Sequence, residues 1–155
     1  MPTFNVYSHV IVPVGERLKS DSRFAGINVF YDRSEEKIVP HAFMPAITYF
    51  VMPTGAEDLT RGSRTGTFQD RRFRLPMGFG IWSFGGQPDK LDEALWEVSG
   101  DLRDWLSENT DFDRLNGVAI LAPRVVQIDY AGDENGMFGS QMIRCDFELF
   151  SGSGV

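Results

Sequence analysis

Apolar residues recur every three or four positions near the start of the chain, a spacing typical of the buried face of a helix. The pattern is formed by Tyr7, Val10, Ile11, Val14 and Leu18. Pro13 interrupts it, because a proline inside a helix removes a hydrogen bond and clashes with the preceding turn. Either the helix is kinked there, or a short extended piece precedes a helix that starts near Pro13. We expect a helix over most of this segment.

The clearest helical pattern begins after Pro88, where Asp89 is a suitable N-cap and acidic residues fill the first turn. A single apolar stripe follows, formed by Leu91, Leu95, Val98, Leu102 and Trp105 or Leu106. This stripe indicates an amphipathic helix that packs on the rest of the domain. The polar positions between the apolar ones include Asp101, Asp104 and Glu108.

Three extended segments lie between the two helices. Ile27–Tyr31 and Pro45–Pro53 are rich in β-branched and aromatic residues, and the second is bracketed by prolines that limit pairing at its ends. Asp70–Phe84 alternates along its length and places one set of apolar residues on a single face: Phe73, Leu75, Met77, Phe79 and Ile81. Gly78 and Gly80, on the other face, indicate a close backbone approach, strong curvature or a bulge.

The remaining segments complete the pattern. Gly55–Gln69 is polar, so we expect a loop or the flexible tip of a long hairpin. Val118–Tyr130 reads as a strand region interrupted at Pro123. An Asn-Gly pair follows it, which is a strong hairpin signal, and Met137–Phe150 alternates as the returning strand.

The order helix, strand, strand, long strand, helix, strand, strand predicts an α+β fold. We expect one domain over residues 1–150, with a mainly antiparallel sheet on which an N-terminal helix and one long amphipathic helix pack. Residues 151–155 are expected to form a flexible tail. No apolar run approaches the roughly 20 residues that span a bilayer, and the start of the chain lacks the basic segment of a secretory signal.

Charge is unevenly distributed along the chain, whose formal net charge is −7. Residues 1–85 contain ten basic and eight acidic residues, whereas residues 86–155 contain five and fourteen. A generic nucleic-acid binder would show a basic face, which the acid excess does not favour. The distribution suits a protein that stays near polyanions without binding them, or one whose acidic face meets the basic face of a partner.

Residue types that carry catalysis are sparse. His9 and His41 have no acidic or serine neighbour at a motif spacing, and two scattered histidines with one thiol are too few for a metal site. Cys145 falls on the apolar side of a strand, which indicates a small buried side chain. The glycine pairs lack the Lys-Ser/Thr that completes a phosphate loop. We therefore expect a protein that is not an enzyme and that uses no cofactor or metal.

Arginines cluster around the polar loop and the strand that follows it, at Arg61, Arg64, Arg71, Arg72 and Arg74. These charges could simply keep a loop soluble. Alternatively, the loop presents arginines to a neighbouring copy of the chain, where acidic residues of the long helix are available: Asp101, Asp104 and Glu108. Such head-to-tail contacts between identical subunits close into rings when the rotation allows.

The order of elements resembles that of the tail terminator (tail completion) proteins of long-tailed bacteriophages. The resemblance covers most of the chain. It rests on an N-terminal helix ending at Arg17–Asp21, a loop with Pro40, the Pro-Ala-Ile-Thr-Tyr stretch at Pro45–Tyr49, and the strand-to-helix passage Phe73–Leu106. A closing hairpin completes the similarity.

The resemblance implies a hexameric ring that caps the tail tube, ends its polymerisation and joins the tail to the head-side connector. The expected partners are copies of the chain itself, the tail tube protein and head-side connector proteins, with no membrane. DNA would pass through the channel without specific binding, since an acidic lumen does not retain phosphates. The expected location is the virion, assembled in the host cytoplasm.

Two alternatives remain open from the sequence. One is another phage head–tail joining or tail-tube-like protein, because these share β-rich architectures. The other is a small α+β ligand-binding domain or enzyme, in which aromatic residues would line a pocket: Tyr49, Phe79, Trp82 and Trp96.

Overall fold

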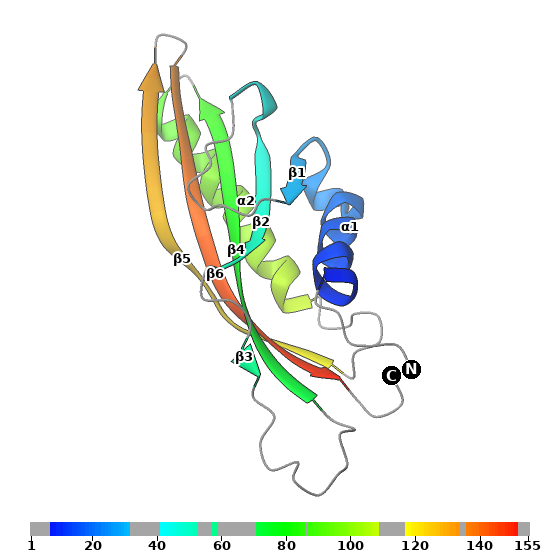
Figure 1. Cartoon of the computed structure of the whole chain (residues 1–155). Helices are drawn as coiled ribbons and strands as arrows, with labels where there is room; N and C mark the ends of the chain where they lie inside the picture. The colour runs from blue at the N-terminus through cyan, green and yellow to red at the C-terminus, as the bar shows by residue number, and fades with distance from the viewer. Residues whose placement is uncertain are drawn as a thin grey trace, which may run out of the picture.

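A six-stranded sheet carries two α-helices on one of its faces in the computed structural model (Figure 1). The structure describes residues 7–31, 41–52, 57–58, 71–85, 87–108, 117–133 and 136–151. The α-helices are α1 (Val12–Ser20) and α2 (Pro88–Glu108). The strands are β1 (Asn28–Tyr31), β2 (Ala46–Val51), β3 (Glu57–Asp58), β4 (Arg71–Gly85), β5 (Gly117–Asp133) and β6 (Gly136–Ser151). Short helical turns are η1 (Tyr7–Ile11), η2 (Ser22–Phe24) and η3 (His41–Phe43).

The strand order is β1-β2-β4-β6-β5, and β3 pairs with β4 outside this path. All pairs are antiparallel except β1 with β2, which is parallel. The predicted α+β fold, with its mainly antiparallel sheet, N-terminal helix and long helix, is confirmed. The prediction of a flexible tail is wrong for Ser151, which is the last residue of β6. Residues 152–155 lie outside the described part of the chain.

The start of the first helix explains how Pro13 is accommodated. Tyr7–Ile11 forms a turn of π-helix, and α1 begins at Val12, so Pro13 lies in the first turn of α1. A proline is tolerated there because the first N–H groups of a helix have no partner within the helix. The predicted helix is therefore confirmed over most of its span. The alternative of an extended piece before Pro13 is wrong.

The core lies between the sheet and the two helices. α2 contributes the apolar stripe expected from the sequence, buried at Leu91, Leu95, Leu102, Trp105 and Leu106. The sheet contributes alternate residues of β4 and β6: Leu75, Met77, Phe79, Ile81, Ile143, Cys145 and Phe147. Burying each large apolar side chain contributes roughly 1.5–3 kcal/mol, so this layer holds the helices on the sheet.

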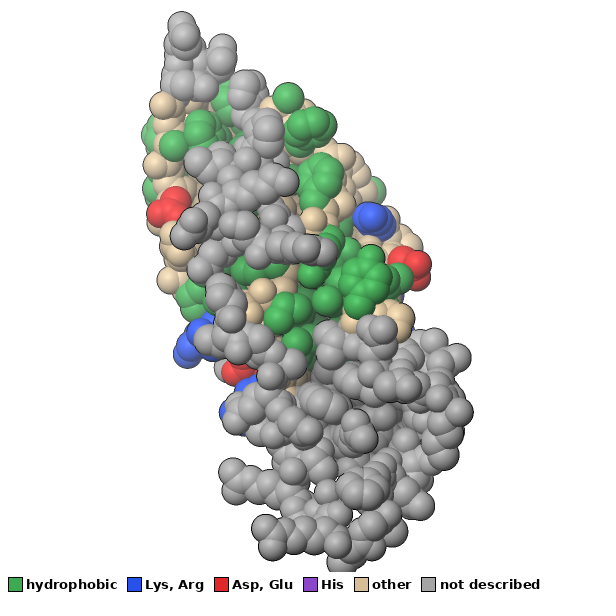
Figure 2. Space-filling model, viewed as in Figure 1, with side chains coloured by type: hydrophobic (Ala, Val, Ile, Leu, Met, Phe, Trp, Pro, Cys, Tyr) green, Lys and Arg blue, Asp and Glu red, His purple; other side chains and the backbone are tan. Residues whose placement is uncertain are grey.

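The face of the sheet opposite α2 explains the two glycines of β4. A Cβ at Gly78 would collide with the ring of Phe50 and lie 3.0 Å from the Sδ of Met52. A Cβ at Gly80 would lie 2.9 Å from the Nε1 of Trp82. The close approach at these glycines is made by side chains, so the predicted approach of another backbone is wrong there. Figure 2 shows apolar side chains gathered on this face.

Two segments differ from their predicted conformation. β5 continues through Pro123, with a shift in its pairing to β6 between Leu121 and Arg124. A bulge on an edge strand tolerates a residue that lacks an N–H, so the predicted interruption is an irregularity within one strand. In the predicted loop, Glu57–Asp58 form β3, because they pair with Phe73 and Arg74. The rest of that loop lies outside the described residues.

Candidate functional site

The residues predicted to form a subunit interface fall in three parts of the chain. Arg61 and Arg64 lie outside the described residues. Arg71 and Arg72 begin β4, where their backbones pair with the end of β6. The acidic set lies on the C-terminal half of α2, with Asp101 half-buried and two exposed members, Asp104 and Glu108. The contact between the arginines and this acidic surface stays a prediction.

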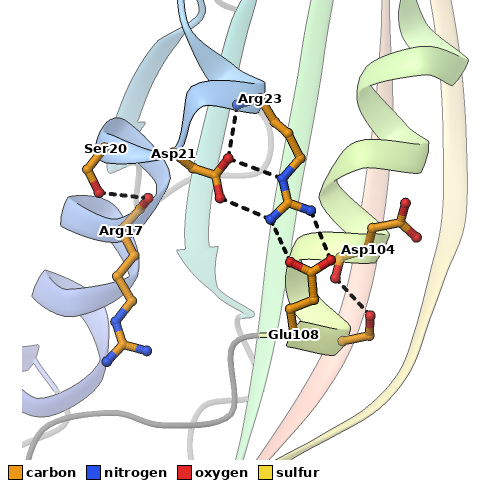
Figure 3. Close-up of polar contacts among 7 residues, drawn as sticks. Arg17, Ser20, Asp21, Arg23, Asp104 and Glu108 are labelled. Carbon is orange, nitrogen blue, oxygen red and sulfur yellow. Dashed lines mark hydrogen bonds and ion pairs between the residues drawn. The ribbon is translucent and has the colours of Figure 1, made fainter.

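Glu108 has a partner within its own chain (Figure 3). The guanidinium of Arg23 donates from Nη2 to Oε2 of Glu108 at 2.7 Å and from Nη1 to Oε1 at 3.2 Å. The same guanidinium donates to Asp21, from Nε to Oδ1 at 3.1 Å and from Nη2 to Oδ2 at 3.0 Å. Arg23 therefore joins the segment after α1 to the last turn of α2.

Asp21 is held by more than this ion pair. Its Oδ1 also accepts a hydrogen bond from the backbone N–H of Arg23 at 2.9 Å, which caps η2. The hydrogen bonds from Arg23 hold the pKa of the Asp21 carboxyl below its ordinary value, and those that Arg23 donates raise its own pKa. Glu108 is thus less available to a neighbouring subunit than Asp104, which sits one helical turn before it.

Exposed apolar side chains mark a different surface. Nine large apolar residues are exposed in the described part of the chain, and eight of them lie at the two opposite edges of the sheet. The first group, which we call the β1-edge patch, consists of Tyr7, Phe30, Tyr31 and Phe43. The second, the β5-edge patch, consists of Trp96, Val126, Ile128 and Tyr130. The ninth residue, Phe84, lies near one end of β4.

Ring contacts organise the β1-edge patch. Tyr31 packs edge-on against Tyr7, with ring centroids 6.4 Å apart, and its ring is tilted against the buried ring of Tyr49 at 5.4 Å. Phe30, on the opposite face of β1, packs edge-on against Phe43 at 6.1 Å. Such pairs fix the orientation of the rings, so the patch is a formed surface with aromatic side chains on both faces of the sheet.

The β5-edge patch joins the edge strand to α2. The hydroxyl of Tyr130 donates to Oδ1 of Asp92 at 2.6 Å, and this bond raises the pKa of Tyr130. Trp96 lies four residues after Asp92, so both share one side of α2. Ile128 lies two residues before Tyr130 and therefore on the same face of β5. Trp96, Ile128 and Tyr130 thus lie on the helix side of the β5 edge, with the carboxylate of Asp92 beside Tyr130.

The two patches lie at the same level of the sheet. When paired residues are followed from β1 through β2, β4 and β6 to β5, Val29 of β1 lies in one row with Ile128 of β5. The neighbouring row joins Phe30 to Gln127 in the same way. In Figure 1, β5 forms one margin of the sheet and β1 the other.

The two edges also differ in charge. The elements at the β1 edge, from η1 to β1, contain three basic and two acidic residues. At the β5 edge, β5 and the Asp92 that Tyr130 contacts contribute one basic and three acidic residues, because the last turn of α2 lies beside Arg23 at the other edge. The two edges would therefore attract each other in an assembly that brought them together.

Other kinds of site find little support in the described residues. Cys145 is buried, as predicted, and burial raises the pKa of its thiol far above the ordinary value. Residues 7–31, 41–52 and the other described ranges contain no group of three His, Cys, Asp or Glu that could hold a metal ion. Within the same ranges, no helix is both long and apolar enough to cross a membrane.

The aromatic pocket predicted for the ligand-binding alternative is wrong. Tyr49 and Phe79 are buried in the core between sheet and helices. Trp82 lies on the opposite face, where its Nε1 donates to the Oγ1 of Thr48 at 3.3 Å, and Trp96 is exposed on α2. These four residues share no cavity because β4 places alternate side chains on opposite faces.

No protein-family model matches the chain, and no curated protein matches its sequence. The geometry of the two edges is therefore the feature of the molecule that indicates a function.

The edge patches were missed in the sequence for a physical reason. Which strand lies at an edge depends on the strand order, and local alternation does not encode that order. One signal was present: Trp96 falls outside the apolar stripe of α2. A tryptophan on the polar side of an amphipathic helix indicates a second apolar contact.

Proposed function

We propose that the protein is a structural subunit of a phage tail, of the tail terminator kind, that assembles with copies of itself into a ring. The ring, a hexamer, caps the tail tube, ends its polymerisation and joins the tail to the head-side connector. DNA passes through its channel without specific binding. The protein accordingly resides in the virion, has no catalytic role and uses no cofactor.

A single observation carries this proposal: two unlike apolar patches lie at opposite edges of one sheet, at the same level. A subunit with one such patch would form an isologous dimer through it. Two different patches on opposite sides suit a heterologous contact, which repeats from copy to copy and closes into a ring. The α+β fold agrees with the resemblance to tail terminators in its element order.

The charge of the chain also supports the proposal. An excess of seven negative charges disfavours retention of DNA, because affinity for phosphates comes largely from lysine and arginine contacts. The acidic residues concentrate on α2 and in the second half of the chain. A channel lined in part by such residues would let a duplex slide through.

The test is the oligomeric state of the purified protein, alone and mixed with tail tube protein. Light scattering after size exclusion is expected to give a multiple of 17.5 kDa, and negative-stain electron microscopy is expected to show six-fold rings. Rings that bind the ends of tail tubes would support the terminator role. A monomer under both conditions would refute the proposal.

A further inference from the structure

We propose that the β1 edge of one copy docks on the β5 edge of the next, so that the sheet continues across the subunit boundary. This inference rests on the proposed assembly and names the surfaces that form it. The occupant of the β5-edge patch is accordingly a second copy of this chain, bound through its own β1-edge patch.

The β5 edge is suited to receive a strand. Among the described residues β5 pairs only with β6, so the other side of its backbone is open. Proteins usually protect long edges with lysine, proline or bulges. On β5 the proline and the pairing shifts fall between Leu121 and Gln127. The following stretch, Gln127–Gly132, is exposed and contains no lysine, arginine or proline.

The β1 edge can supply the matching backbone groups. The N–H of Asn28 donates to the carbonyl of Pro45 at 3.0 Å, so Asn28 faces inward along the sheet. Because successive residues of a strand point their backbone groups to opposite sides, those of Val29 and Tyr31 point away from β2. β1 is only four residues long, so its pairing must be supplemented by side-chain contacts. The aromatic residues of the β1-edge patch provide them.

Side chains at the two edges match in height, face and charge. Val29 and Ile128 share one row, so a copy related by rotation alone brings the β1 edge level with β5. Tyr31, two residues further along β1, lies on the same face of the sheet as Ile128, so the two side chains would be diagonal neighbours within reach of a short cross-linker. The β5 edge, with Asp92 beside it, then approaches the net basic segment that contains α1 in the next copy.

Cysteine cross-linking tests this pairing. The double variant Tyr31→Cys/Ile128→Cys, treated with a short bismaleimide, is expected to give a ladder of covalent multimers. Each single variant is expected to remain uncross-linked, because head-to-tail pairing never brings two copies of the same edge together. The native thiol of Cys145 does not interfere, since it is only 1% exposed. A second pair, Phe30→Cys/Gln127→Cys, lies in the neighbouring row and serves if the first variant fails to fold.

A lysine substitution at the β5 edge gives a second test, and the same substitution outside both patches is its control. Ile128→Lys places a lysine on the open edge and is expected to raise the half-assembly concentration by about tenfold or more. Phe84 is 38% exposed, as is Ile128, but it belongs to neither patch. Phe84→Lys is therefore expected to leave the half-assembly concentration within about twofold of that of wild type.

The outcomes separate this pairing from the proposed function. Rings that form without cross-linking of the double variants would overturn edge docking and leave the ring proposal intact. Cross-linked dimers of Ile128→Cys alone would overturn it too, by showing that the β5 edge pairs with itself. Equal effects of the two lysine variants would also contradict it. Only the absence of any assembly by the wild-type chain would overturn the proposed function.

Discussion

Gly15 of α1 lies against the hydroxyl end of Tyr49 of β2, and its replacement by alanine gives the sharpest test of how this helix packs on the sheet. A Cβ at this position would lie 2.8 Å from the Cζ of Tyr49 and closer still to the hydroxyl. Tyr49 is only 6% exposed and its ring is packed against Tyr31, so it has little room to move. The methyl group therefore has to push α1 away from the sheet or distort the tyrosine.

Two opposing contributions set the size of the effect. Alanine in place of glycine inside a helix stabilises by about 1 kcal/mol. Overpacking a core contact costs about 1–3 kcal/mol, and this contact is at the severe end because both partners are rigid. We expect Gly15→Ala to lower the free energy of unfolding by about 1–2 kcal/mol, which corresponds to a fall in Tm of about 2–8 °C.

Urea and thermal denaturation followed by circular dichroism would measure this change. Gly100→Ala is the matched control, because Gly100 lies inside α2 and a Cβ there would meet nothing within 4 Å. The control should gain stability by up to about 1 kcal/mol. Tyr49→Phe removes the closest atom, so the double variant with Gly15→Ala should recover part of the loss. A Gly15→Ala protein as stable as the Gly100→Ala protein would refute the reasoning.

Two further predictions concern titratable groups. The hydrogen bonds from Arg23 hold the pKa of Asp21 below its ordinary 3.8, so their contribution to stability is complete above about pH 4 and is lost as the pH falls through the lowered pKa. The difference in Tm between wild type and Asp21→Asn should thus shrink as the pH falls from about 5 to about 2. A difference that stays constant over this range would contradict the prediction. Burial raises the pKa of Cys145, so the native protein should not react with a thiol reagent at about pH 8, whereas the unfolded chain should. Rapid reaction of the native protein would show that β6 opens.

Local patterns predicted the elements well because they depend on neighbouring residues. The apolar stripe of α2 and the alternation of β6 are both present as expected. Pro13 and Pro123 were read as interruptions, yet each lies where a missing N–H costs little: the first turn of a helix and a bulge of an edge strand.

Contacts between distant segments could not be predicted in the same way. The parallel pairing of β1 with β2 and the ion pair of Arg23 with Glu108 each join residues that share no local signal. The candidate site also depends on contacts between distant segments. The sequence alone shows the acidic residues of the long helix, whereas the two edge patches can be recognised only from the strand order.

The position of β6 in the sheet has a consequence for biosynthesis. β4 pairs along its whole length with β6, from Arg71 with Ser151 to Gly85 with Met137, so its partner is translated only after α2 and β5. Until then, one side of the long apolar β4 has no strand to bind. The nascent chain therefore exposes one unpaired edge of β4 for much of its synthesis. Unpaired strand edges are recognised by chaperones and favour aggregation when many copies are made at once.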